Sequence, residues 1–223
     1  MYEKMIAVTS HTAFEKWLAK EGADISFPKE ALQEGQIGFP ENTELLELYL
    51  EQIRRIARSD LQGVILREKD LEESKYEDLA KKVLEICKQH GKPCILHYYP
   101  EAARRLAAEG VHLPLEKFLL LKKEKPELLA GFKRVGVSTH SVEDAILAYS
   151  HGATYLTAGH VYATDCKKGL PPRGLAFLKE VCKAVPIPVY GIGGIHSGNV
   201  DAVLEAGAAA GCIMSAAMNP AAF

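Results

Sequence analysis

The 223-residue sequence predicts an α/β protein with one domain, a (β/α)8 TIM barrel over residues 1–223. Short apolar runs alternate with longer amphipathic runs, which is the order of strands and helices in a parallel sheet. Most short runs are continuously apolar, as expected for strands buried on both faces. Because there are eight of them, we favour a closed barrel over the alternative, an open doubly wound sheet.

These apolar runs give the expected strands. They are Met5–Thr9, Val64–Leu66, Cys94–Leu96, Val111–Leu113, Val135–Val137, Tyr155–Ala158, Val189–Ile192 and Cys212–Met214. The expected helices between them include Thr43–Arg58, Lys75–His90, Ser141–His151 and Gly198–Ala206. Ser141 is a suitable N-cap for its helix, with Asp144 in the first turn.

Two segments depart from this alternation. Residues 10–42, after the first strand, form an extended βα connection that resembles an insertion. This connection contains a possible short helix, Thr12–Lys20, and a stretch rich in Pro and Gly from Phe27 to Pro40. At the other end, the chain reaches Phe223 without room for more than a truncated eighth helix after Met214.

A truncated eighth helix is expected to leave apolar barrel wall uncovered. Large apolar patches rarely stay exposed to water. Either residues 10–42 cover this wall through Phe14, Trp17 and Leu18, or a second subunit does. We therefore predict a homodimer.

The composition excludes several classes of protein. A net charge of −2 gives no basic surface for nucleic acid, and no apolar stretch is long enough to span a membrane. The five cysteines form no CxxC pair, and the N-terminus does not resemble a secretion signal. Reduced thiols in a cytoplasmic protein, with neither nucleic acid nor membrane as partner, are the expectation.

Histidines gather at the expected carboxyl ends of the strands, where barrels hold their active sites. Six of the eight fall there: His11, His97, His112, His140, His160 and His196. Any one of them can simply satisfy hydrogen bonds at the rim of a barrel. Imidazole also suits transition metals, but there is no HxH pair and no adjacent carboxylate, so no metal site is predicted.

A glycine-rich turn gives the strongest local signal for binding. Gly193 and Gly194 lie where the seventh strand ends and a helix begins, so backbone N–H groups and the helix dipole can meet an anion. Ser215 and Ala216 follow the eighth strand and can add further donors. A packing role for the glycines is the alternative, but the loops after strands seven and eight commonly bind phosphate in this fold.

Cationic residues accompany this turn. Arg67 and Lys69 follow the second strand and suit a phosphate or carboxylate, although charged loops are often only solvated. The long segment from Gly159 to Gly174 is flanked by glycines and is interpreted as a mobile lid. Its His160, Thr164 and Lys167 are candidate ligands of the substrate.

The segment after the fifth strand contains Ser138 and His140. A histidine at this position faces the centre of the barrel mouth, where an acid or base that works at neutral pH is useful. We predict that His140 is catalytic and that Ser138 contacts the substrate.

Four motifs, GVSTHS, GHVYATDCKKG, GIGGI and MSAA, occur in this order and spacing. Together they resemble the thiamine phosphate synthase and TenI superfamily, over roughly Val64 to Met218. Residues 10–42 have no recognised counterpart. The resemblance implies one of two enzyme activities.

The synthase of this superfamily joins a thiazole phosphate to a pyrimidine diphosphate and uses Mg²⁺. Its motifs are Gln-x-Arg-Glu-Lys-Asp, Asn-Asp and Gly-Gln-Glu-Asp. This chain has Ile65 in place of the glutamine, His97 and Tyr98 in place of Asn-Asp, and residues 114–117 read Pro-Leu-Glu-Lys. Because both expected aspartates are missing, we expect synthase activity to be absent.

The TenI branch is similar in the loop from His160 to Gly169. It includes thiazole tautomerases, in which the histidine at the position of His140 transfers a proton. The resemblance therefore implies a cofactor-independent isomerase that acts on a thiazole carboxylate phosphate in thiamine biosynthesis. The alternatives are the Mg²⁺-dependent synthase and a non-catalytic regulator that binds a thiazole or thiamine phosphate.

Overall fold

The computed structural model describes residues 2–21 and 39–222, and its strands close into one parallel barrel. The strands are β1 (Met5–Val8), β2 (Gly63–Leu66), β3 (Cys94–His97), β4 (Gly110–Pro114), β5 (Arg134–Thr139), β6 (Tyr155–Gly159), β7 (Val189–Ile192) and β8 (Ala210–Ile213). Each strand pairs with the next, and Ala7 of β1 pairs with Val64 of β2 on one side and Ile213 of β8 on the other. The prediction of a (β/α)8 barrel is confirmed, and the open-sheet alternative is wrong.

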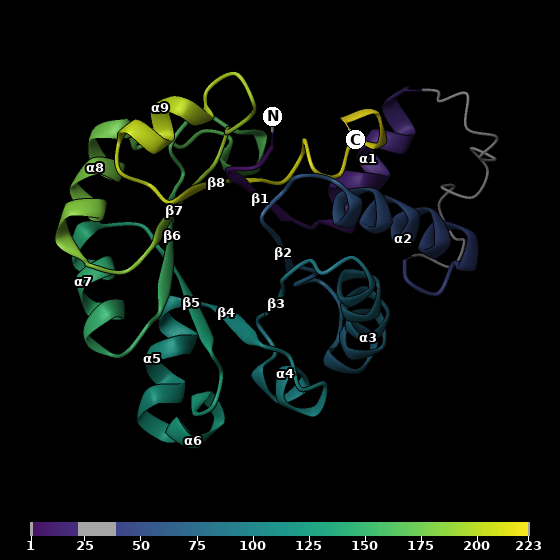
Figure 1. The fold of residues 1–223 in the computed structure, drawn as a ribbon, viewed down its shortest axis with the longest axis horizontal. Coiled ribbons are helices and arrows are strands. Elements are labelled where there is room, and N and C mark those ends of the chain that lie inside the picture. The colour runs from purple at the N-terminus through teal and green to yellow at the C-terminus, as the bar shows by residue number, and fades with distance from the viewer. Residues whose placement is uncertain (1, 22–38, 223) are drawn as a thin grey trace.

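Helices surround the barrel on its outer face (Figure 1). They are α1 (His11–Glu21), α2 (Thr43–Arg58), α3 (Glu73–Gln89), α4 (Pro100–Arg105), α5 (Leu115–Glu124), α6 (Pro126–Leu129), α7 (Val142–Ser150), α8 (Gly174–Ala184) and α9 (Val200–Glu205). Ser141 caps α7 as predicted, because its side chain accepts a hydrogen bond from the N–H of Asp144 at 2.9 Å.

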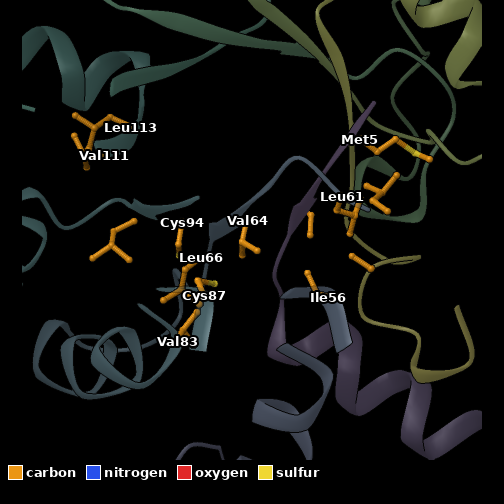
Figure 2. Close-up of a cluster of buried hydrophobic side chains, with 14 of the residues drawn as sticks. Met5, Ile56, Leu61, Val64, Leu66, Val83, Cys87, Cys94, Val111 and Leu113 are labelled. Carbon is orange, nitrogen blue, oxygen red and sulfur yellow. The ribbon is translucent and has the colours of Figure 1, made fainter. Parts of the chain in front are cut away.

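The core lies in two layers on either side of the strands. Met5 and Ala7 of β1 belong to the large layer between strands and helices, part of which appears in Figure 2. Ile6 and Val8 alternate with them and join Ile65 in a smaller cluster inside the barrel. This is the physical reason for the continuous apolar runs, since successive side chains point to opposite faces and both faces are buried.

The extended first connection begins with α1, which confirms the helix expected at Thr12–Lys20. Phe14 and Leu18 of α1 are buried in the core, and Trp17 is partly buried against it. Most of the stretch from Phe27 to Pro40 lies outside the described residues. The chain therefore covers part of its own barrel wall, while the homodimer stays a prediction.

The end of the chain packs against α2 and lies near α1 (Figure 1). Gln52 donates a hydrogen bond to the carbonyl oxygen of Ala217 at 2.7 Å, and Arg55 donates to that of Pro220 at 3.1 Å. In the described part of the chain, only a short 3-10 helix, Pro220–Ala222, follows β8. The described residues after β8 therefore contain no full helix.

Two further expectations concern the thiols and the membrane. Cys87, Cys94, Cys182 and Cys212 are free thiols, and burial raises the pKa of Cys212 to about 12. The side chain of Cys166 lies outside the described part of the chain.

Within residues 2–21 and 39–222, no helix is both long and apolar enough to cross a membrane. The cytoplasmic location stays a prediction.

Candidate functional site

A cavity of about 490 Å³ opens at the carboxyl ends of the barrel strands. Its volume is in the ordinary range for a small-molecule site. Every residue predicted for the site lines this cavity, namely Arg67, Lys69, Ser138, His140, His160, Thr164, Lys167, Gly193, Gly194, Ser215 and Ala216. The fold brings them together because parallel strands deliver their following loops to one end of the barrel. Their individual roles stay predictions.

The glycine turn after β7 requires its glycines. Gly193 has φ +102° and Gly194 has φ +64°, in the left-handed region where other residues are strained. A Cβ atom on Gly193 would also lie 2.3 Å from the Cβ of His160, and one on Gly194 would lie 2.5 Å from the carbonyl oxygen of Ala163. Tight packing against the loop after β6 is therefore one reason for these glycines.

The backbone donors of this turn also remain available to a ligand. Among the described residues, none accepts a hydrogen bond from the N–H groups of Gly193, Gly194, Ser215 or Ala216. All four residues line the cavity. Unpaired amides that converge on a cavity can bind an anion, so packing and anion binding are compatible explanations.

A buried carboxylate holds the loop after β2, whose residues also line the cavity. Glu68 is 2% exposed and accepts hydrogen bonds from the hydroxyls of Thr9 and Tyr49, both at 2.6 Å. The N–H of Arg67 donates to Thr9 Oγ1 at 2.9 Å. Since Glu68 points away from the cavity, Arg67 and Lys69 on either side of it line the cavity as cations.

His140 has a defined orientation at the mouth of the barrel. Its Nδ1 lies 2.9 Å from the carbonyl oxygen of Gly159. A carbonyl oxygen only accepts, so this contact places a proton on Nδ1. In the neutral ring, Nε2 is then a hydrogen-bond acceptor. The backbone N–H of His140 donates to Asp144 at 2.8 Å, which fixes the start of α7.

The other histidines separate into different environments. His97 and His160 line the cavity, whereas His11 contacts Glu68, and His196 accepts from the N–H of Gly198. The expectation that His112 lies at a strand end is wrong. It is the middle residue of β4 and is buried inside the barrel.

The two barrel histidines are neutral at physiological pH. Burial and the nearby Arg67 lower the pKa of His112 to about 3. Burial, then the neighbouring His112 and Arg67, hold the pKa of His97 well below its ordinary value. The Nδ1 atom of His97 is buried and has no hydrogen-bond partner in the described structure. Neither ring supplies a positive charge to the cavity.

The segment after β6 contributes some of its cations but not all. Thr164 and Lys167 line the cavity, and Asp165–Lys167 form a short 3-10 helix. Lys168 is exposed and does not line the cavity, and the Arg173 guanidinium lies 5.5 Å from the centre of the Phe177 ring. These last two cations do not line the cavity, and opening of the segment as a lid stays a prediction.

Tyr98 is a lining residue that was not predicted from the sequence. It has φ +77° and lines the cavity directly after His97. The ammonium group of Lys117 lies 3.7 Å from the centre of the Tyr98 ring, and burial lowers the pKa of Lys117. The signal in the sequence was the replacement of Asn-Asp by His97 and Tyr98, which showed a departure from the synthase motif but not its geometry.

The side chains that line the cavity do not fit Mg²⁺, which prefers carboxylate and other oxygen ligands. None of the described residues that line the cavity is Asp or Glu. Glu68, which lies between Arg67 and Lys69 in the chain, is engaged by Thr9, Tyr49 and His11. In the described ranges, no three His, Cys, Asp or Glu side chains form a group suited to a metal ion.

The comparisons with known proteins identify the family. A family model described as thiamine monophosphate synthase, the TMP-TENI family, matches residues 40–217. The chain belongs to this family. A thiamine-phosphate synthase of Thermus thermophilus is 38% identical over 164 residues, which cover 73% of this chain and 78% of that protein. One from Clostridium acetobutylicum is 38% identical over 144 residues, or 65% and 67% of the two chains.

A solved structure supports the fold of this family member. The thiamine phosphate pyrophosphorylase from Pyrococcus furiosus aligns with a TM-score of 0.70 at 23% identity, over 97% of this chain and 87% of that chain. At this level of identity the likeness shows the barrel and not the activity.

These relatives correct the predicted activity. The relatives at 38% identity are named thiamine-phosphate synthases, so the prediction of a tautomerase-like isomerase is wrong and the synthase alternative is better supported. The expectation that synthase activity is absent loses its support for the same reason. The loop from His160 to Gly169 did not distinguish the synthase from the tautomerase branch. His160, Thr164 and Lys167, which line the cavity, suit a phosphorylated substrate in either reaction.

Proposed function

We propose that this chain is a transferase that forms thiamine phosphate from a thiazole phosphate and a pyrimidine diphosphate. One observation carries the proposal beyond the family relationship. The cavity is lined by unpaired backbone amides at Gly193, Gly194 and Ser215, after β7 and β8, and by the cations Arg67 and Lys69, after β2. Two separate anionic groups therefore have complementary partners in one cavity of about 490 Å³.

In the proposed reaction, the ring nitrogen of the thiazole attacks the methylene carbon of the pyrimidine. A C–N bond forms, the bond between that carbon and the diphosphate oxygen breaks, and the electron pair leaves with the diphosphate. Negative charge then increases on the leaving group. Arg67 and Lys69, with Lys167 across the cavity mouth, are the described cations that can stabilise this charge.

His140 is not assigned a proton transfer in this reaction. Its role as catalytic base was part of the isomerase prediction and is withdrawn with it. The bond between its Nδ1 and the carbonyl oxygen of Gly159 leaves Nε2 as an acceptor at the cavity wall. We infer that His140 helps to orient a substrate group that donates a hydrogen bond.

The test is an assay with hydroxymethylpyrimidine diphosphate and thiazole phosphate, with Mg²⁺ in one series and EDTA in another. We expect thiamine phosphate and pyrophosphate to appear in equal amounts. Lys167→Ala is expected to lower kcat/KM about tenfold or more, because it removes a cation at the cavity. Lys168→Ala is the matched control, since this neighbouring lysine is exposed and outside the cavity lining.

Absence of product in both series would overturn the proposal. If thiazole phosphate nevertheless raised the Tm of the protein without turnover, the non-catalytic alternative would replace it.

A further inference from the structure

A line of hydrogen bonds crosses the interior of the barrel from one end to the other. The hydroxyl of Tyr155 lies 2.9 Å from Nδ1 of His112, and Nε2 of His112 lies 2.8 Å from Oγ of Ser138. Ser138 lines the substrate cavity at the carboxyl ends of the strands. Tyr155 lines a second cavity, of about 300 Å³, at their amino ends.

The space for this line of bonds exists because position 136 is glycine. A Cβ atom on Gly136 would lie 2.1 Å from the Tyr155 ring and 2.4 Å from Nδ1 of His112. Since its φ is not in the left-handed region, Gly136 is required for room and not for backbone conformation. Any larger residue would separate the two groups.

The number of protons on these groups is fixed. Burial raises the pKa of Tyr155 well above its ordinary value, so the phenol keeps its proton. Burial lowers the pKa of His112 to about 3, so the imidazole carries a single N–H. Within the described residues, Nδ1 of His112 is the one partner of the Tyr155 hydroxyl. A phenol that donates to Nδ1 leaves the imidazole proton on Nε2.

This proton order determines what Ser138 can do. Its oxygen then accepts from Nε2–H of His112, and it also accepts from the Thr157 hydroxyl at 3.3 Å. Both acceptor positions of the serine oxygen are filled. The Thr157 hydroxyl also lies 3.4 Å from Nε2 of His112, but a protonated Nε2 cannot accept from it, so Thr157 donates to Ser138. The hydrogen of the Ser138 hydroxyl is then available to the cavity.

We propose that Tyr155 and His112 are positioning residues that make Ser138 an obligatory hydrogen-bond donor to the bound ligand. The site then selects a heterocycle that presents an acceptor atom, such as a ring nitrogen, over one that presents an N–H group at the same place. This inference rests on the proposed function only in taking a phosphorylated heterocycle as the occupant of the cavity.

The first test observes the proton directly. In protein labelled with 15N-histidine, NMR shifts distinguish the two tautomers of His112, and we expect the form protonated at Nε2. Tyr155→Phe keeps the ring but removes the donor, and is expected to abolish this preference. Tyr190→Phe is the matched control. The Tyr190 ring centre lies 5.1 Å from that of Tyr155, and Tyr190 lines the same second cavity without a hydrogen bond to His112. A parent protein protonated at Nδ1 would overturn the proposal.

The second test measures binding without turnover. Tyr155→Phe and Ser138→Ala are each expected to weaken binding of thiazole phosphate about tenfold. Neither should change binding of inorganic phosphate, which we expect at the amides of Gly193 and Gly194. The double variant should bind as weakly as Ser138→Ala alone, because Tyr155 acts through Ser138. Independent, multiplying effects would overturn the proposal, as would a parent protein that does not bind thiazole phosphate.

These outcomes separate the inference from the proposed function. If the chain forms no thiamine phosphate but shows the Nε2–H tautomer and the non-additive double variant, the transferase proposal fails and the role of Tyr155 and His112 stands. Thermal melting of each variant identifies any that does not fold, and for such a variant the tautomer of the parent protein still decides the question.

Discussion

Nδ1 of His11 lies 2.8 Å from Oε2 of Glu68, and this pair joins the first turn of α1 to the loop that carries Arg67 and Lys69. The backbone N–H of His11 donates to the same carboxylate oxygen, also at 2.8 Å. The His11 ring stacks on Phe39, with 4.8 Å between ring centres. One buried carboxylate, Glu68, therefore fastens the start of the long first connection to the loop that lines the cavity.

The stability contributed by this pair depends on pH. Burial lowers the pKa of His11, but the hydrogen bond and charge of Glu68 outweigh it, so the pKa lies above its ordinary 6.5. A raised pKa gives stability that is fully present below pH 6.5 and is lost as the pH rises through the folded-state pKa. We expect His11→Gln to cost more at pH 6 than at pH 8, by about 1 kcal/mol at most, in urea unfolding.

His90→Gln is the control for this comparison, because His90 is exposed at the end of α3. Its cost is measured at both pH values and gives the baseline for replacing an exposed histidine by glutamine. An equal cost of His11→Gln at pH 6 and pH 8 would show that the ion pair does not form.

His97 and His112, the two histidines inside the barrel, give stability with the opposite dependence on pH. Their pKa values are lowered, that of His112 to about 3, so the folded state resists protons that the unfolded chain binds below pH 6.5. The associated stability is present above pH 6.5 and is lost as the pH falls toward 3. For His112, this lowers the unfolding free energy by about 1.4 kcal/mol per pH unit in this window. Urea unfolding between pH 6 and pH 4 measures how steeply the unfolding free energy falls with pH. His112→Asn should reduce this slope by the amount that corresponds to one bound proton.

Comparison of Gly91 with Gly194 separates the cost of backbone strain from the cost of steric contact. Gly91 has φ +62°, and a Cβ atom added there would meet no described atom within 4 Å, whereas Gly194 has φ +64° and an oxygen at 2.5 Å. We expect Gly91→Ala to cost about 1 kcal/mol of unfolding free energy through strain alone. Gly194→Ala should cost about 2 kcal/mol more and should abolish binding of inorganic phosphate in calorimetry. Equal costs for the two variants would mean that the turn at Gly194 can shift freely.

The cations at the cavity should hold a diphosphate by themselves. Because the cavity lining described above has cations and no carboxylate, we expect pyrophosphate to bind as tightly in EDTA as in Mg²⁺. Arg67→Ala should weaken this binding about tenfold. Arg173→Ala is the control, since this nearby arginine packs on Phe177 outside the cavity. Binding that requires Mg²⁺ would contradict the assignment of the donor atoms.

Much of the site followed from the sequence because a barrel converts chain order into spatial proximity. Gly193 and Arg67 are far apart in the chain, yet each directly follows an apolar strand, and parallel strands bring such positions to the same end. The motif resemblance identified the superfamily but selected the wrong branch, since the relatives at 38% identity are named thiamine-phosphate synthases.

The sequence by itself determined the eight strands, the mouth residues and the cap at Ser141, because periodicity and capping are local properties. Only the tertiary structure decided that His112 faces the barrel interior and meets Tyr155, and that Glu68 points away from the cavity toward Tyr49. These contacts depend on the register and tilt of neighbouring strands and on the room left at Gly136. Such relationships join residues that are distant in sequence, so no local pattern in the chain records them.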